Sequence, residues 1–142
     1  MPLSKAEKTI LLAVWERISP YIEEFGAQAL TRMFRCFPET KIYFHEKNID
    51  PGSSYVRNQG GKIVTAIGTA VQNADNIQEA LADLCCLHAY RIRVDPVNFQ
   101  YFSKCFLTVL AVHLQDDFTA DVHVVWDKFM CMLSCILAVK YR

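Results

Sequence analysis

Apolar residues recur every three or four positions along almost the whole chain, which is the period of an α-helix. Ile10, Leu11, Val14 and Ile18 form one apolar stripe, and later segments repeat the same spacing. Glycine and proline are few, with five of each, and no repeat or low-complexity segment interrupts the pattern. The sequence therefore predicts an all-α fold, and its length of 142 residues suits one domain over 1–142.

Start and stop signals divide this pattern into seven or eight expected helices. SKAE at 4–7 is a capping box, and Thr119 is a cap for the last helix. Ser19-Pro20 and Asp95-Pro96 each resemble an N-cap followed by a first-turn proline. The expected helices span 4–18, 20–36, 39–44, 53–73, 77–90, 96–114 and 119–139, with a loop at 115–117. Unequal lengths and helix-breaking prolines favour crossed packing over a simple up-and-down bundle.

The charge balance argues against nucleic acid and membrane partners. Fifteen basic and fifteen acidic residues give a formal net charge of zero, and neither sign gathers into a run. No apolar window is long enough for a membrane span, and the charged first residues do not form a signal peptide. We expect a cytoplasmic protein. Because hydrophobic residues make up 52% of the chain, part of that surface is expected to be buried against another chain.

The six cysteines are Cys36, Cys85, Cys86, Cys105, Cys131 and Cys135. They lie in apolar helical segments, and the expected compartment is reducing, so we expect free thiols acting as small hydrophobic side chains. Only Cys85 and His88 are spaced as zinc ligands, and no further pair completes a tetrahedral site.

A histidine interrupts the apolar stripe of the 77–90 helix. Leu81, Leu84, Leu87 and His88 share one face, so the imidazole points in the same direction as the leucines. It is either a core histidine bonded to a backbone carbonyl or a single axial ligand of a bound metal. The spacing leaves both possibilities open.

Several motifs resemble, in order and spacing, the haemoglobin alpha-type chains of vertebrates, which belong to the globin family. They are FPETKIYF at 37–44, LHAYRIRVDPVNF at 87–99, DFT at 117–119, WDKF at 126–129 and KYR at 140–142. The resemblance covers the whole length. EEFGAQALTRMF at 23–34 is similar to the minor or embryonic members, which are D-, mu- or zeta-like.

The resemblance implies a globin fold with haem b between the 53–73 helix and the 77–90 helix. His88 matches the proximal iron ligand, and Phe44 matches the phenylalanine that stacks on the ring. The other positions matching the haem pocket are Met33, Tyr43, Lys62, Leu84, Leu87, Ile92, Val94, Asn98, Phe99, Phe102 and Leu137. Most are apolar, and an apolar pocket excludes water and slows oxidation of ferrous iron.

The ligand side departs from the family pattern. Gln59 stands where the family usually has histidine, and Ile63 stands where it usually has valine. The Gln59 amide can still donate a hydrogen bond to bound dioxygen, whereas the larger Ile63 is expected to slow ligand entry. Residues 45–47 replace proline, histidine and phenylalanine with His45, Glu46 and Lys47. We expect this loop to weaken haem retention, with Lys47 or Lys62 pairing with a propionate in partial compensation.

The resemblance also implies two surfaces for beta-type chains in an alpha2beta2 heterotetramer. The first surface comprises Arg32, Lys104, Cys105, His113, Phe118, His123 and Asp127. The second comprises Lys41, Tyr43, Arg93, Asp95, Pro96, Asn98, Tyr141 and Arg142. The implied function is reversible dioxygen transport in the red-cell cytoplasm, and no catalytic residue is expected.

Two alternatives belong to other classes of protein. A haem protein for redox, nitric oxide or peroxide chemistry or sensing gains some support from the altered ligand side and from Cys85-Cys86. Rapid oxidation with substrate turnover would distinguish it from an oxygen carrier, which forms a stable oxygenated spectrum. The other is a haem-free helical interaction protein in which His88 is a core residue. Such a protein would have no Soret absorbance band.

Overall fold

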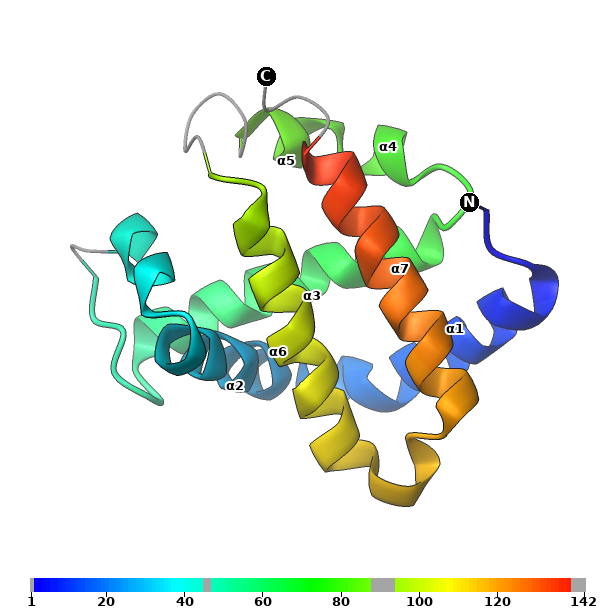
Figure 1. Ribbon diagram of the computed structural model, residues 1–142, viewed down its shortest axis with the longest axis horizontal. Helices are drawn as coiled ribbons and strands as arrows, with labels where there is room; N and C mark the ends of the chain where they lie inside the picture. The colour runs from blue at the N-terminus through cyan, green and yellow to red at the C-terminus, as the bar shows by residue number, and fades with distance from the viewer. Residues whose placement is uncertain (1, 45–46, 88–93, 139–142) are drawn as a thin grey trace.

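The computed structural model describes residues 2–44, 47–87 and 94–138, with the backbone alone at residues 85 and 86. Over these residues it is all-α, as the sequence predicts (Figure 1). The elements are α1 (Lys5–Ile18), η1 (Ser19–Tyr21), α2 (Ile22–Cys36), η2 (Pro38–Phe44), α3 (Ser54–Gln72), α4 (Ile77–Ala80), α5 (Ala82–Cys86), α6 (Val97–Leu114), η4 (Gln115–Asp117) and α7 (Ala120–Ala138). The η elements are short 3₁₀-helices.

The helix caps predicted at Ser4 and Thr119 are confirmed, and the structure adds a third at Ser53. Ser4 and Glu7 form the full capping box of α1, with the Glu7 amide donating to Ser4 Oγ at 3.1 Å and the Ser4 amide donating to Glu7 Oε1 at 2.8 Å. Ser53 Oγ accepts from the Val56 amide at 3.3 Å, and Thr119 Oγ1 accepts from the Val122 amide at 3.2 Å. Each cap satisfies an amide that would otherwise lack an intrahelical partner.

Two predicted proline boundaries need correction. Ser19 is helical and its hydroxyl donates back to Glu16 O at 3.4 Å, so it is not an N-cap; η1 follows, and α2 begins at Ile22. At the start of α6, the helix begins at Val97 instead of Pro96. The Asp95 carboxylate accepts from the Val97 amide at 3.1 Å, so it still satisfies an amide of the first turn.

The prediction of one continuous helix over 77–90 is wrong, because the helix is interrupted at Leu81, between α4 and α5. Leu81 has φ −111° and ψ 18°, outside the helical range, and its side chain is 5% exposed. Ile77, in the preceding turn, is 3% exposed. Burial of both side chains in the core outweighs the loss of helical continuity at Leu81. Residues 88–90 of the predicted helix lie outside the described residues, and the predicted loop at 115–117 is the 3₁₀-helix η4.

Two glycines set the crossing of α2 and α3. A Cβ on Gly26 would lie 2.1 Å from Gly60 O, and one on Gly60 would lie 2.4 Å from Gly26 C. The backbones of α2 and α3 therefore touch here, and they are too close for any side chain to fit between them. Figure 1 shows α3 passing behind α6 and α7 and running across them, which confirms the expectation of crossed packing.

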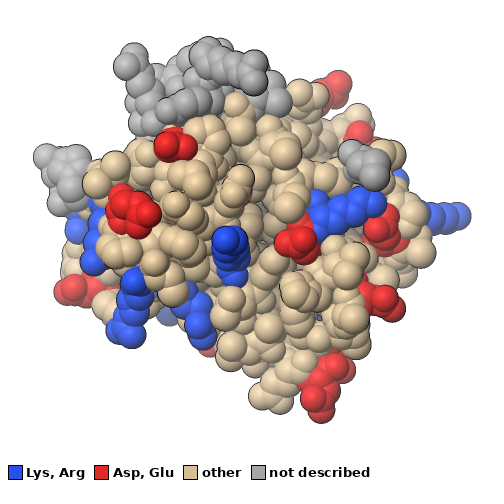
Figure 2. Space-filling view, viewed as in Figure 1, with Lys and Arg blue, Asp and Glu red and all other residues tan. Residues whose placement is uncertain are grey.

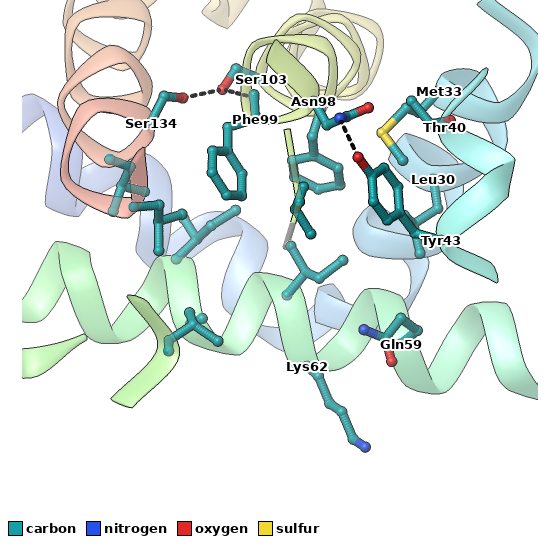
Figure 3. Close-up of a pocket in the computed structure, with 18 of the residues that line it drawn as sticks. Leu30, Met33, Thr40, Tyr43, Gln59, Lys62, Asn98, Phe99, Ser103 and Ser134 are labelled. Carbon is teal, nitrogen blue, oxygen red and sulfur yellow. Dashed lines mark hydrogen bonds between the residues drawn. The ribbon is translucent and has the colours of Figure 1, made fainter. Parts of the chain in front are cut away.

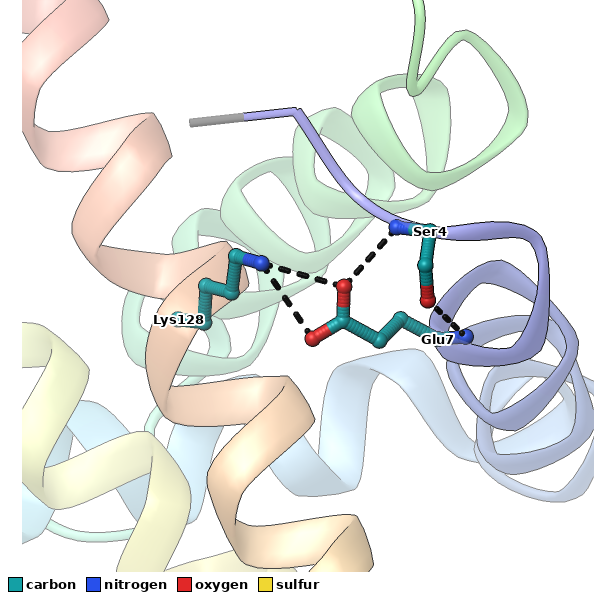
Figure 4. A network of polar contacts seen from close by, with 3 residues as sticks. All are labelled: Ser4, Glu7 and Lys128. Carbon is teal, nitrogen blue, oxygen red and sulfur yellow. Dashed lines mark hydrogen bonds and ion pairs between the residues drawn. The ribbon is translucent and has the colours of Figure 1, made fainter.

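Polar contacts tie the first and last helices together. Lys128 Nζ on α7 lies 3.0 Å and 3.2 Å from the two carboxylate oxygens of Glu7, the same residue that completes the capping box of α1 (Figure 4). The hydrogen bond from the Ser4 amide, and then the Lys128 ammonium, lower the pKa of Glu7. A single carboxylate thus stabilises both a helix start and a contact between helices.

The face shown in Figure 2 carries Lys, Arg, Asp and Glu side chains separated by broad uncharged areas. No side of that face is covered by charges of one sign, which agrees with the even balance of the sequence. Among the described residues, no helix is long and apolar enough to cross a membrane.

Replacing Gly26 with alanine should destabilise the fold. The new Cβ would clash with the backbone of Gly60, which cannot rotate away as a side chain can. We therefore expect the free energy of unfolding, measured by urea denaturation, to fall by about 3 kcal/mol. Gly61→Ala is the matched control, because its Cβ would meet the flexible Glu23 Cγ at 3.0 Å. That variant should be as stable as the parent. Equal stability of the two variants would contradict the close contact.

The contribution of Glu7 to stability should depend on pH. Because its folded pKa lies below its ordinary value of 4.5, the ionised form stabilises the fold above that value. The contribution disappears as the pH falls through the lowered pKa, where both states are protonated. The stability difference between the parent and Glu7→Gln should therefore be largest above pH 4.5 and should shrink toward zero as the pH falls through the lowered pKa. Glu16→Gln, at an exposed position of the same helix, is the control, and a Glu7→Gln difference that does not change between pH 7 and acid pH would refute the assignment.

Candidate functional site

A cavity of about 440 Å³ lies between α2, η2, α3, the α4–α5 region, α6 and α7 (Figure 3). Its size is within the range of small-molecule and cofactor sites. Aliphatic and aromatic side chains form most of its wall, including Leu30, Ile67, Phe102 and Leu133. A site of this kind suits a largely apolar ligand that is removed from water.

One face of α3 supplies a continuous wall. The lining residues Tyr55, Gln59, Lys62, Ile63, Ala66 and Ile67 follow the three- and four-residue spacing of a helical stripe. Gly60 lies next to Gln59 in sequence and packs against α2, so the glycine contact fixes the helix that carries this wall. Gln59 is half-buried, whereas Lys62 is exposed and extends away from the other labelled residues in Figure 3.

Polar groups on the η2 side of the cavity form a small network. The Tyr43 hydroxyl accepts hydrogen bonds from the Asp95 amide at 3.0 Å and from Asn98 Nδ2 at 3.3 Å (Figure 3). Asn98 Nδ2 also donates to Asp95 O at 2.8 Å. These bonds join η2 to the residues that begin α6, although the two segments are far apart in sequence.

Two serines between α6 and α7 place hydroxyls in the apolar wall. Ser103 Oγ donates to Phe99 O at 2.8 Å, and Ser134 Oγ donates to Met130 O at 2.9 Å. The two hydroxyl oxygens lie 3.4 Å apart. Because both hydroxyl protons are used within their own helices, the serines offer a ligand acceptor lone pairs but no free donor.

Aromatic rings cluster where η2 meets the start of α3. Phe44 packs edge-on against Phe34, with ring centroids 5.2 Å apart, and against Tyr55 at 6.3 Å. The Lys47 ammonium lies 5.6 Å from the Tyr55 ring centroid. Partial burial raises the pKa of Tyr55 above its ordinary value, so its phenol stays protonated at neutral pH.

Apart from Lys47, the alternative propionate partner, every predicted cofactor or ligand residue that the structure describes lines this cavity. They are Met33, Tyr43, Phe44, Gln59, Lys62, Ile63, Leu84, Leu87, Val94, Asn98, Phe99, Phe102 and Leu137. His88 and Ile92 lie outside the described residues, and so does the His45-Glu46 part of the loop. The residues on either side of the undescribed segment 88–93, Leu87 and Val94, both line the cavity.

Sequence reasoning missed several lining residues, namely Leu30, Thr40, Tyr55, Ala66, Ile67, Leu81, Ser103, Met130, Leu133 and Ser134. Ala66 and Tyr55 could have been found by extending the stripe through Gln59 and Ile63 in both directions. Thr40 gave no such signal. It is 1% exposed because its hydroxyl donates to Phe37 O at 2.8 Å, a local bond that allows a polar residue to be buried.

Most residues of the first predicted partner surface are accessible. Arg32, Lys104, His113, His123 and Asp127 are exposed, and Phe118 is half-buried. His113 Nε2 lies 2.8 Å from Gln28 Oε1, and its ring centroid lies 4.6 Å from that of Phe25. Cys105 differs from the rest, since it is 4% exposed and burial raises its pKa to about 11.

The second predicted surface is described only in part. Lys41 and Asp95 are exposed, whereas Tyr43, Pro96 and Asn98 are half-buried. Arg93, Tyr141 and Arg142 lie outside the described residues. Contact of either surface with another chain stays a prediction.

The cysteine prediction is confirmed in one respect and wrong in another. Cys36, Cys105, Cys131 and Cys135 are free thiols. Only Cys105 among these four is a core residue, whereas Cys36, Cys131 and Cys135 are exposed, because they occupy the outer faces of α2 and α7. Within the described part of the chain, no three His, Cys, Asp or Glu side chains converge as metal ligands.

Comparisons with known proteins agree with this architecture. Residues 27–136 match the family model described as Globin. The chain is 48% identical to haemoglobin subunit alpha-D of Meleagris gallopavo and 49% identical to that of Chrysemys picta bellii, over 99% of each chain. It is 46% identical to haemoglobin subunit zeta of Capra hircus over the full length of both chains. The expected similarity to D-like and embryonic alpha-type chains is therefore confirmed.

Proposed function

This chain belongs to the globin family, as a vertebrate haemoglobin chain of the alpha type, and we propose that it carries dioxygen reversibly on ferrous haem. One observation carries the proposal. The pocket positions inferred from sequence motifs between residues 33 and 137 meet at a single cavity wherever the structure describes them. A cavity of this size lined by these residues is expected for a cofactor site, whereas an ordinary core packs such side chains together without leaving space.

The chemistry of the cavity suits haem b. Haem is a flat apolar ring with two carboxylates on one edge, and bound ferrous haem supplies the iron that takes up dioxygen. Phe99, Phe102 and Leu137 would contact the ring, while the exposed Lys62 can pair with a carboxylate at the boundary with water. The apolar walls exclude water and protons, which slows oxidation of the iron.

We assign the proximal iron ligand to His88. The assignment rests on sequence spacing, since His88 follows Leu84 by four residues and Leu87 by one, and both leucines line the cavity. Gln59 and Ile63, which lie on the α3 wall, are proposed to meet the bound dioxygen. The Gln59 amide can donate a hydrogen bond to it, and the Ile63 side chain narrows the space for its entry.

We further propose that the chain assembles with beta-type chains into an alpha2beta2 heterotetramer in the red-cell cytoplasm. The alpha-type relatives are named as haemoglobin subunits, and the exposed residues Arg32, His113 and His123 supply an accessible surface for such a partner. No catalytic residue and no turnover are assigned. The carrier function predicts a stable oxygenated form, which separates it from redox chemistry.

Reconstitution with hemin tests the proposal directly. The reduced protein should show a Soret band and a stable oxygenated spectrum, and His88→Gly should release its haem more than ~100-fold faster because the only protein bond to iron is lost. Added imidazole should restore retention in this variant by replacing the missing ligand. His123→Gly, at an exposed position, is the control. A parent protein that stays colourless, or a His88→Gly variant that retains haem equally well, would refute the assignment.

Ligand entry should depend on the two unusual residues of the α3 wall. Combining Gln59→His with Ile63→Val should raise the association rate of carbon monoxide or dioxygen several-fold, because a methylene is removed beside the ligand. Flash photolysis of the ligated protein measures this rate. Ile10→Val removes the same methylene at a core-packed position outside the cavity and should leave the rate unchanged. If the double variant also matches the parent, Gln59 and Ile63 do not control entry.

A further inference from the structure

Tyr55 is the first residue of the α3 wall and lies one turn before Gln59. It lines the cavity and is half-buried, so the same side chain contacts the cavity and is partly accessible to solvent. A tyrosine suits such a position, because its ring is apolar and its hydroxyl tolerates water. The spacing of the α3 stripe is consistent with its membership of the wall, and its contacts with Phe44 and Lys47 appear only in the structure.

Two neighbours hold the Tyr55 ring in place. Phe44 meets it edge-on, with centroids 6.3 Å apart and planes inclined by 67°, and Phe44 is itself held by Phe34. This is the favourable geometry for aromatic pairs. In addition, the Lys47 ammonium lies 5.6 Å from the ring centroid, within the range of cation–π attraction.

The position of Lys47 is itself set by the backbone. Its amide donates to Phe44 O at 2.9 Å, so the turn that leaves η2 brings Lys47 to the start of α3. Phe44, Lys47 and Tyr55 therefore link η2, the following loop and α3 through one aromatic ring. Without that ring, the wall before Gln59 would lose its outermost apolar surface.

We propose that Tyr55, positioned by Phe44 and Lys47, closes the rim of the cavity and slows the escape of bound haem. The inference rests on the proposed haem function and goes beyond it by assigning a retention role to a residue outside the expected pocket. It also changes the significance of the 45–47 loop, which is expected to weaken retention. Lys47 does not line the cavity itself but holds the ring that does.

Release of hemin from the ferric protein to an excess of a haem-scavenging apoprotein measures this role. Tyr55→Gln should release hemin ~3- to 10-fold faster, because the aromatic contact is lost, whereas Tyr55→Phe should stay within about twofold of the parent. Tyr21→Gln is the matched control, since Tyr21 is 56% exposed and does not line the cavity. Circular dichroism of the haem-free variants checks that their helical content is unchanged.

The role of Lys47 is separated by a double-mutant cycle. Lys47→Met alone should release hemin about twofold faster, and it should have no further effect in the Tyr55→Gln background, because Lys47 acts through the ring. A second measurement follows the Tyr55 phenol by the absorbance difference between the parent and Tyr55→Phe at high pH. Its titration should move to higher pH when hemin is bound and covers the ring further.

The outcomes are distinct. A parent chain that takes up no hemin overturns both the haem function and this inference. Uptake by the parent with equal release from Tyr55→Gln overturns this inference alone, and so does release from Tyr55→Phe as fast as from Tyr55→Gln. An unmoved phenol titration on hemin binding also overturns it, because the ring would then not lie against the haem.

Discussion

The close contact between Gly26 and Gly60 is the constraint on which the site depends. Since a Cβ on either residue would fall within 2.4 Å of the other's backbone, α2 and α3 can approach this closely only with glycine at both positions. Gly68 fixes α3 at a position further along the same helix, because a Cβ on Gly68 would lie 2.2 Å from Trp15 Cζ2. Contacts at these two positions, with α2 and with α1, leave α3 little freedom to rotate. Its remaining face, through Gln59 and Ile63, therefore forms a wall of the cavity.

The polar groups of the cavity are distributed unevenly, and this can orient a ligand that has one polar edge. Tyr43 and Asn98 bond to each other on the η2 side, and the exposed Lys62 lies on the α3 wall. Between α6 and α7, Ser103 and Ser134 donate to carbonyls of their own helices. A flat molecule with carboxylates on one edge is more stable with that edge near Lys62 and water than near the serines, because burying an unpaired carboxylate costs several kcal/mol.

The sequence predicts the local features of this fold well and the tertiary ones less well. Ser4, Ser53 and Thr119 cap helices through bonds within three residues, so a short motif contains all the information. The break at Leu81 depends on burial against distant helices, which no local window records. The candidate site shows the same difference between what local sequence and what tertiary contacts reveal. Family motifs located most of the wall, whereas Tyr55 was missed because a half-buried tyrosine in a polar segment looks like a surface residue until Phe44 and Lys47 are placed beside it.

The hydrogen bonds around Tyr43 connect the cavity to the second predicted partner surface, and their strength sets how much coupling free energy they alone can carry between the two. Tyr43 lines the cavity, and its hydroxyl accepts from the Asp95 amide and from Asn98 on the predicted surface. A ligand can shift an equilibrium only by the difference in its interactions with the two states. Two hydrogen bonds of ordinary strength contribute about 2 kcal/mol together. Coupling energies between sites are typically ~1–3 kcal/mol, so breaking this network accounts for an effect of ordinary size, and any larger effect needs contacts beyond Tyr43.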